Sequence, residues 1–181
     1  TPESVAEFRL GTGSANAYPK LGPVVVSELM YHPPDLGGVD NVRDEYVELV
    51  NTSGGLVRLY DVVRPTNTWR LRGGVDYDFP TGVTLAAGEA LLVVSFDPVN
   101  DTNSLAGFLA TYHLSRCTRM YGPYSGKLDN GGESVKVVKV GVPVGGVVPR
   151  IVVERVAYDD VAPWDVWADG TGQSLQRLDG A

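Results

Sequence analysis

The sequence predicts an all-β fold, a sandwich of two sheets interrupted by one short helix. Short runs rich in Val, Leu, Thr and Tyr recur between clusters of Gly, Pro, Asn and Asp, and the 181 residues include 22 Gly and 12 Pro. This alternation is typical of antiparallel β proteins. A hydrophobic share of 43% is enough for one core of ordinary domain size.

Nine strands are expected, a number typical of a sandwich. They lie near residues 24–31, 44–51, 56–61, 68–72, 77–80, 90–96, 134–140, 151–158 and 173–178. The run at 90–96 is almost continuously apolar, which predicts a strand that is buried between a sheet and a helix. Residues 1–22 show little periodicity and are expected to form a connector, with the domain at 23–181.

Helical spacing occurs once. The i, i+3, i+4, i+7 pattern is formed by Leu105, Phe108, Leu109 and Tyr112. Either Asn103 or Ser104 is expected to cap the first exposed amides of this helix.

Charge and composition exclude several classes of partner. The net charge of -7 and the isoelectric point near 4.7 argue against nucleic acid or an anionic lipid surface. No apolar run approaches the roughly 18 to 20 residues of a membrane span, so no membrane insertion is expected, and this segment contains no signal peptide. The single Cys117 excludes an intrachain disulfide.

Five segments resemble the lamin-tail domain, and in particular its bacterial branch. In order they are VVVSELMYHPP, DEYVELVN, TNTWRLRGGVDYDFPTGVTLAAGEALLVVS, YGPYSGKLDNGGESVKVV and APWDVWADGTGQSLQRLD. The resemblance covers about 23–179 and implies an immunoglobulin-like β-sandwich. It departs from the family at two longer loops, HPPDLGGVDNVR and VGVPVGGVVPR. It also implies an extracellular or cell-surface location within a longer chain that carries other domains.

Two glutamates interrupt the strands near 24–31 and 44–51. Strand parity places Glu45 on one face with Val47 and Leu49, and Glu48 on the other face. If Leu29, Leu49, Leu59 and Leu71 form the core together with Trp69, then Glu28 and Glu48 point outward. We expect Arg58, Arg70 and Arg72 to share that outer face and to form a surface ion ladder with the glutamates.

A catalytic alternative is a carboxylate pair formed by Glu28 and Glu48, as in glycoside hydrolysis. A flat outer sheet face without a cleft argues against it. Neither His32 nor His113 has a nucleophile or an orienting carboxylate at a recognisable spacing. One Cys and two His are too few for a closed zinc site, and no phosphate-binding glycine loop is present.

Calcium is the metal that the loops favour. Acidic residues gather in two groups, and hard cations bind several loop oxygens. The groups are Asp35, Asp40 and Asp44 before the second strand, and Asp159, Asp160, Asp165 and Asp169 near the end. Neither group matches a calcium-loop motif, and loop aspartates commonly stabilise turns. No cofactor and no metal ligand is therefore assigned.

Trp164 and Trp167 lie in a loop with Pro163 and Gly170. An exposed pair of indoles could stack on a sugar or anchor a protein partner. The alternative is that at least one indole closes the open end of the sandwich.

These observations predict a non-catalytic lamin-tail-like module of a large bacterial exported protein, acting in adhesion, spacing or protein interaction. The expected partner is a protein or a cell-surface glycan. Two alternatives stay open: a glycan-binding accessory module that uses Trp164 or Trp167, and a hydrolase whose site the sequence does not reveal.

Overall fold

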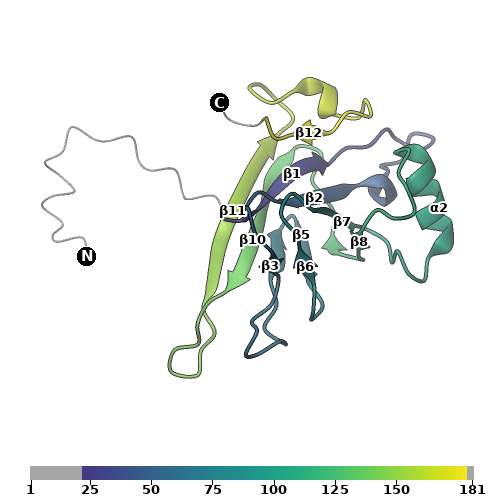
Figure 1. Cartoon of the computed structure of the whole chain (residues 1–181). Coiled ribbons are helices and arrows are strands. Elements are labelled where there is room, and N and C mark those ends of the chain that lie inside the picture. The colour runs from purple at the N-terminus through teal and green to yellow at the C-terminus, as the bar shows by residue number, and fades with distance from the viewer. Residues whose placement is uncertain (1–21, 179–181) are drawn as a thin grey trace, which may run out of the picture.

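The computed structural model describes residues 22–178, and the predicted connector at 1–22 lies outside this range except for Gly22. Two five-stranded sheets pack face to face, and the helix α2 lies at one side of them (Figure 1). The fold is thus an all-β, immunoglobulin-like sandwich, and within the described residues α2 is its one α-helix. The predicted fold class is confirmed.

The first sheet contains the two strands with the glutamates. Its order is β12 (Leu175–Gln176), β1 (Val24–Met30), β2 (Tyr46–Asn51), β7 (Ala90–Val94) and β8 (Met120–Tyr121). All neighbours are antiparallel except β7 and β8, which run parallel. The first strand, β1, is therefore paired with the last strand, β12.

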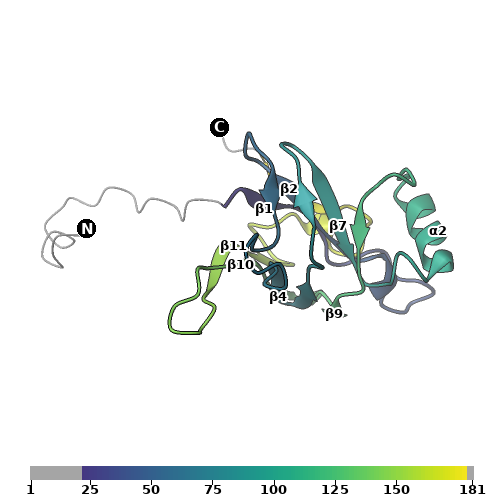
Figure 2. The same ribbon diagram turned by 60° about the horizontal axis from the view of Figure 1, so that its bottom comes forward.

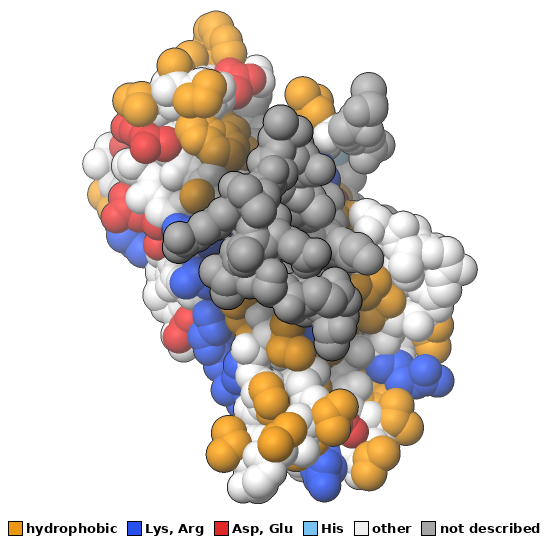
Figure 3. Space-filling model, turned by 90° about the vertical axis from the view of Figure 1, so that its left-hand side faces the viewer, with side chains coloured by type: hydrophobic (Ala, Val, Ile, Leu, Met, Phe, Trp, Pro, Cys, Tyr) orange, Lys and Arg blue, Asp and Glu red, His pale blue; other side chains and the backbone are white. Residues whose placement is uncertain are grey.

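The second sheet is dominated by a long hairpin. Its order is β11 (Arg150–Asp159), β10 (Gly132–Val140), β4 (Arg70–Gly73), β5 (Val75–Asp78) and β9 (Ser125–Gly126). Because β4 pairs only with 135–138, the end of the β10–β11 hairpin projects beyond the sheet (Figure 2). Exposed valines at 142, 144 and 147 lie near its tip. Figure 3 shows hydrophobic side chains gathered at the lower end of this face.

Several predicted strands have different limits in the structure. The strand expected at 44–51 begins at Tyr46 because the 3₁₀ turn η1 (Val42–Asp44) precedes it. The strand expected at 56–61 is only β3 (Val57–Arg58), which pairs with β6 (Thr84–Leu85). The strands β6, β8 and β9 were not predicted, since each has two residues and so is too short to show a period.

The predicted core is confirmed. Leu49, Leu59 and Leu71 are fully buried, Leu29 is 2% exposed and Trp69 6%. They belong to one cluster that both sheets contribute to. The parity argument thus identified the inner faces of β1, β2 and β4 correctly.

The helix α2 (Thr102–Thr111) covers the outer face of the first sheet. Phe108, fully buried, belongs to a second apolar cluster that includes Met30 and Tyr46. The capping prediction was wrong: the cap is Asp101, whose carboxylate accepts from the Ser104 amide at 3.0 Å. This outer face is therefore partly buried, and not flat and hydrated as the sequence suggested.

Candidate functional site

The predicted ion ladder does not form. Glu28 and Glu48 lie directly opposite each other across β1 and β2. The arginines are elsewhere, since Arg70 lies on the second sheet and pairs with Asp78 at 3.2 Å. Strand parity reports the face of a residue but not its sheet, and this is why the prediction was wrong.

Hydroxyl groups take the place of the expected arginines. Tyr46 donates its hydroxyl proton to Glu28 at 2.5 Å, and the Ser174 hydroxyl bonds the same oxygen. Ser27 donates to Glu48 at 2.6 Å. Burial and the Glu28 carboxylate raise the pKa of Tyr46, so this phenol stays a donor.

Glu45 is a core residue and no part of any surface pair. Its side chain is fully buried, and its Oε2 accepts from the Tyr124 hydroxyl at 2.7 Å and from the Leu128 amide at 2.9 Å. Within residues 22–178, its Oε1 has no hydrogen-bond partner. Burial raises the pKa of Glu45 to about 7. Parity had already placed it with Val47 and Leu49, which was the available signal for its burial.

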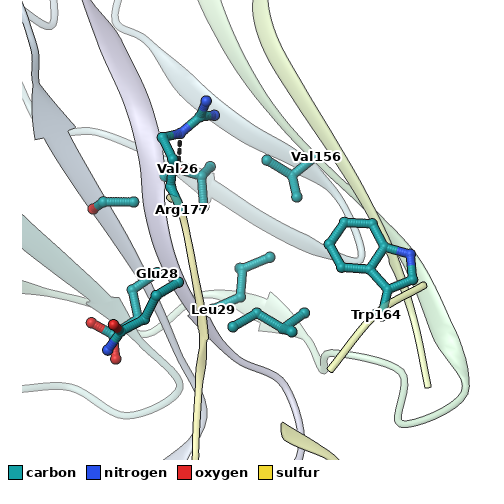
Figure 4. Close-up of a pocket in the computed structure, with 9 residues that line it drawn as sticks. Val26, Glu28, Leu29, Val156, Trp164 and Arg177 are labelled. Atoms are coloured by element: carbon teal, nitrogen blue, oxygen red, sulfur yellow. Dashed lines mark hydrogen bonds between the residues drawn. The ribbon is translucent and has the colours of Figure 1, made fainter. Parts of the chain in front are cut away.

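A narrow apolar cavity, here called the apolar slot, opens between the two sheets. Its volume is about 190 Å³. Figure 4 shows Val26 and Leu29 of β1 on one side and Val156 of β11 with Trp164 on the other. The remaining lining residues are Ser27, Glu28, Leu175, Gln176 and Arg177. Apart from a charged rim, the slot presents hydrocarbon to a ligand.

A larger hollow, here called the aromatic pocket, adjoins the slot. Its volume is about 650 Å³, and it shares Glu28, Trp164, Leu175 and Gln176 with the slot. Its own lining includes Met30, Tyr46, Tyr112, Pro163, Asp165, Gly172, Gln173, Ser174 and Leu178. Tyr112 is fixed there, because its hydroxyl donates to the Asp44 carbonyl at 2.6 Å.

The two tryptophans have different environments. Trp164 is partly buried, packs against the main core and lines both cavities. Trp167 is 61% exposed and lies in the 3₁₀ turn η2 (Val166–Ala168), which Asp165 caps by accepting from the Trp167 amide. The structure thus separates the pair, and Trp164 is the one that lines the two cavities described above.

The two histidines also have different environments. His113 ends α2 with φ of 52°, as expected of a helix-end residue. His32 lies beside Asp169, with 2.5 Å between Nδ1 and Oδ1. An orienting carboxylate therefore exists, 137 residues away. Sequence spacing could not reveal it, because the contact depends on the fold.

The acidic loops are partly neutralised. Asp44 is buried and accepts from Arg43 at 3.1 Å, whereas Lys127 contacts Asp40 at 2.8 Å. That lysine lowers the pKa of Asp40. In the second group, the adjacent Asp159 carboxylate raises the pKa of Asp160.

Comparisons with known proteins leave the family open. No model of a known protein family matches the chain, and no curated protein matches it either. In the described part of the chain, no helix has both the length and the apolar character needed to cross a membrane.

Proposed function

We propose that this domain is a non-catalytic, lamin-tail-like binding module of a large bacterial exported protein, and that it acts in adhesion, spacing or protein interaction. The observation that supports the proposal best is the apolar slot beside Trp164. A rigid sandwich that holds such a cavity is suited to anchoring one side chain of a partner.

The slot has the features of an interface anchor point. Its walls are aliphatic and aromatic, and its volume of about 190 Å³ suits one aliphatic side chain. Glu28 and Arg177 stand at the rim and make it polar. Central apolar contact with a polar rim is the usual arrangement of protein interfaces.

A second candidate is glycan binding, which the aromatic pocket favours. Trp164 and Tyr112 offer ring faces for stacking on a sugar, and Gln173 offers an amide for hydroxyl groups. Pockets of several hundred Å³ with a few polar groups are the usual form of small-ligand sites.

Catalysis by the glutamate pair receives less support. Glu28 lines both cavities, but Glu48 lines neither of them in the described structure. Glu28 also accepts two hydroxyl donors, Tyr46 and Ser174. Hydrolysis of ester, phosphate or glycoside substrates that Glu28→Gln abolishes would refute the non-catalytic proposal.

The binding proposal is tested with a displayed library of random peptides and a glycan array. Val156→Phe fills the slot, and Val152→Phe, on the same strand and 53% exposed, is the matched control. We expect peptides selected on the wild type to bind at least about tenfold more weakly to Val156→Phe and unchanged to Val152→Phe.

The same variants separate the two candidates. Val156 lines the slot but not the aromatic pocket, and Gln173 lines the aromatic pocket but not the slot. Glycan binding that Gln173→Ala weakens and Val156→Phe leaves intact would replace the protein-partner proposal by the glycan one. Peptide binding that is equal in all variants would refute the slot as the anchor.

A further inference from the structure

The loop between β1 and β2 brings three metal-ligating side chains together. One ligand atom each of His32, Asp35 and Asp40 lies within 4.8 Å of the other two. The His32 Nε2 atom is 3.8 Å from the Asp35 Oδ1 atom. Two carboxylates and an imidazole thus converge from one loop, and none of the three residues lines the apolar slot.

His32 is oriented as metal-ligating histidines are. Its Nδ1 faces the Asp169 carboxylate at 2.5 Å, which leaves Nε2 directed toward Asp35. In metal sites the ring nitrogen that does not bind the metal usually donates to such a carboxylate, which fixes the tautomer and makes the ligand more basic. The side chain of His32 is 20% exposed, so part of the ring faces solvent.

A buried, unsatisfied oxygen lies in the same loop. Asn41 is 4% exposed, and its amide donates to the Pro34 carbonyl at 3.2 Å and to Asp44 at 2.9 Å. Among the residues that the structure describes, its Oδ1 has no hydrogen-bond partner. Buried acceptors are normally paired with a donor or a cation, so an unpaired oxygen is a further unusual feature of the loop that carries the three ligands.

One cation already contacts the cluster. Lys127 reaches Asp40 at 2.8 Å, and Asn130 donates to the other oxygen of Asp40 at 3.2 Å. The lysine side chain is 54% exposed and flexible, so it can leave when a stronger cation arrives. Lys127 is therefore a competitor for the site.

We propose that His32, Asp35 and Asp40 form a three-ligand site for a divalent ion of the zinc class, with Asp169 as the positioning residue. An imidazole nitrogen with two carboxylates suits zinc, whereas calcium prefers oxygen ligands alone. Bonds of roughly 2.1 Å require ligand atoms roughly 3.4 Å apart. The half-exposed Asp35 side chain can rotate to close this gap.

The site couples two loops. Asp169 belongs to the same segment as Trp164 and Trp167, and the Gly170 amide donates to the His32 carbonyl at 3.0 Å. Metal binding at His32 would therefore hold the tryptophan-bearing segment against the β1–β2 loop. The metal proposal does not depend on what the apolar slot binds.

The test uses tag-free protein with Cys117→Ser, so that the exposed thiol cannot take up zinc. Calorimetric titration with Zn²⁺ and with Ca²⁺ is combined with the thermal midpoint in Zn²⁺ and in chelator, because an ion that binds the native state alone raises the midpoint. We expect one equivalent of zinc to bind, and Asp35→Asn or His32→Ala to abolish it.

Two further variants distinguish this site from incidental binding. Asp169→Asn should weaken zinc binding by about 10- to 100-fold. Lys127→Met should strengthen it by up to about fivefold, since it removes the competing cation. His113→Ala, which changes the other histidine, should have no effect.

Three results would overturn the proposal: no zinc binding, zinc binding that survives Asp35→Asn, or a response to calcium without one to zinc. Each variant is first checked for an unchanged thermal midpoint in chelator, so that loss of folding is not read as loss of metal. These readouts involve neither peptides nor glycans, so their outcome is independent of the binding proposal.

Discussion

Replacing Glu45 by Gln tests the buried carboxyl group directly. Glu45 is fully buried, and its Oε2 accepts from Tyr124 and Leu128. A glutamine carbonyl can accept the same two bonds. The substitution therefore keeps the size and these contacts of the side chain but removes its titration.

The size of the effect follows from the pKa. Burial raises the pKa of Glu45 from 4.5 to about 7. Between these values the native state keeps a proton that the unfolded chain has lost, so the free energy of unfolding falls as pH rises. The loss begins above the unfolded pKa, is complete above the native pKa, and amounts to about 3 kcal/mol.

The assay is urea unfolding at about pH 5 and about pH 8, followed by tryptophan fluorescence. We expect the wild type to lose about 2.5 kcal/mol more than Glu45→Gln over this interval, because all other titrating groups are common to both proteins and part of the loss has already occurred at pH 5. Equal pH dependence in wild type and Glu45→Gln would refute the argument.

Three further predictions concern stability, each measured by urea unfolding. Arg177→Met leaves the Glu154 carboxylate, 5% exposed, without its cation and should cost about 3 kcal/mol; a change below about 0.5 kcal/mol would contradict the ion pair. Asp101→Ala removes the α2 cap and should cost about 1 kcal/mol, whereas Asn103→Ala should cost clearly less. Phe108→Ala should lower the free energy of unfolding by about 3–5 kcal/mol, because it leaves a cavity between α2 and the first sheet.

Much of the fold was predictable from local patterns. Alternation and turn residues identified the long strands, and the apolar run at 90–96 correctly indicated a strand covered on both faces, now β7. The two-residue strands were missed because they arise from the packing of neighbours and not from periodicity. The cap was misplaced by two or three residues, since Asp, Asn and Ser all stand at the start of α2 and each can serve as a cap.

The candidate site was less predictable. Trp164 was singled out, but its cavity depends on β12, which returns to pair with β1 from the far end of the chain. The contact of His32 with Asp169 likewise joins distant segments. Glu45 is the exception, because its position in the strand alternation already indicated the core. Its burial was not predicted, since charged residues are usually at the surface.

The pairing of β12 with β1 has a mechanical consequence. These antiparallel neighbours are joined through two residue pairs, Glu28 with Gln176 and Leu29 with Leu175. The chain enters at the start of β1 and leaves at the end of β12, on the same side, so a pulling force would break their hydrogen bonds one after another instead of shearing them together. Both cavities are lined by Leu175 and Gln176 and would come apart with this strand. Under tension, both cavities would therefore be lost before the sandwich unfolds.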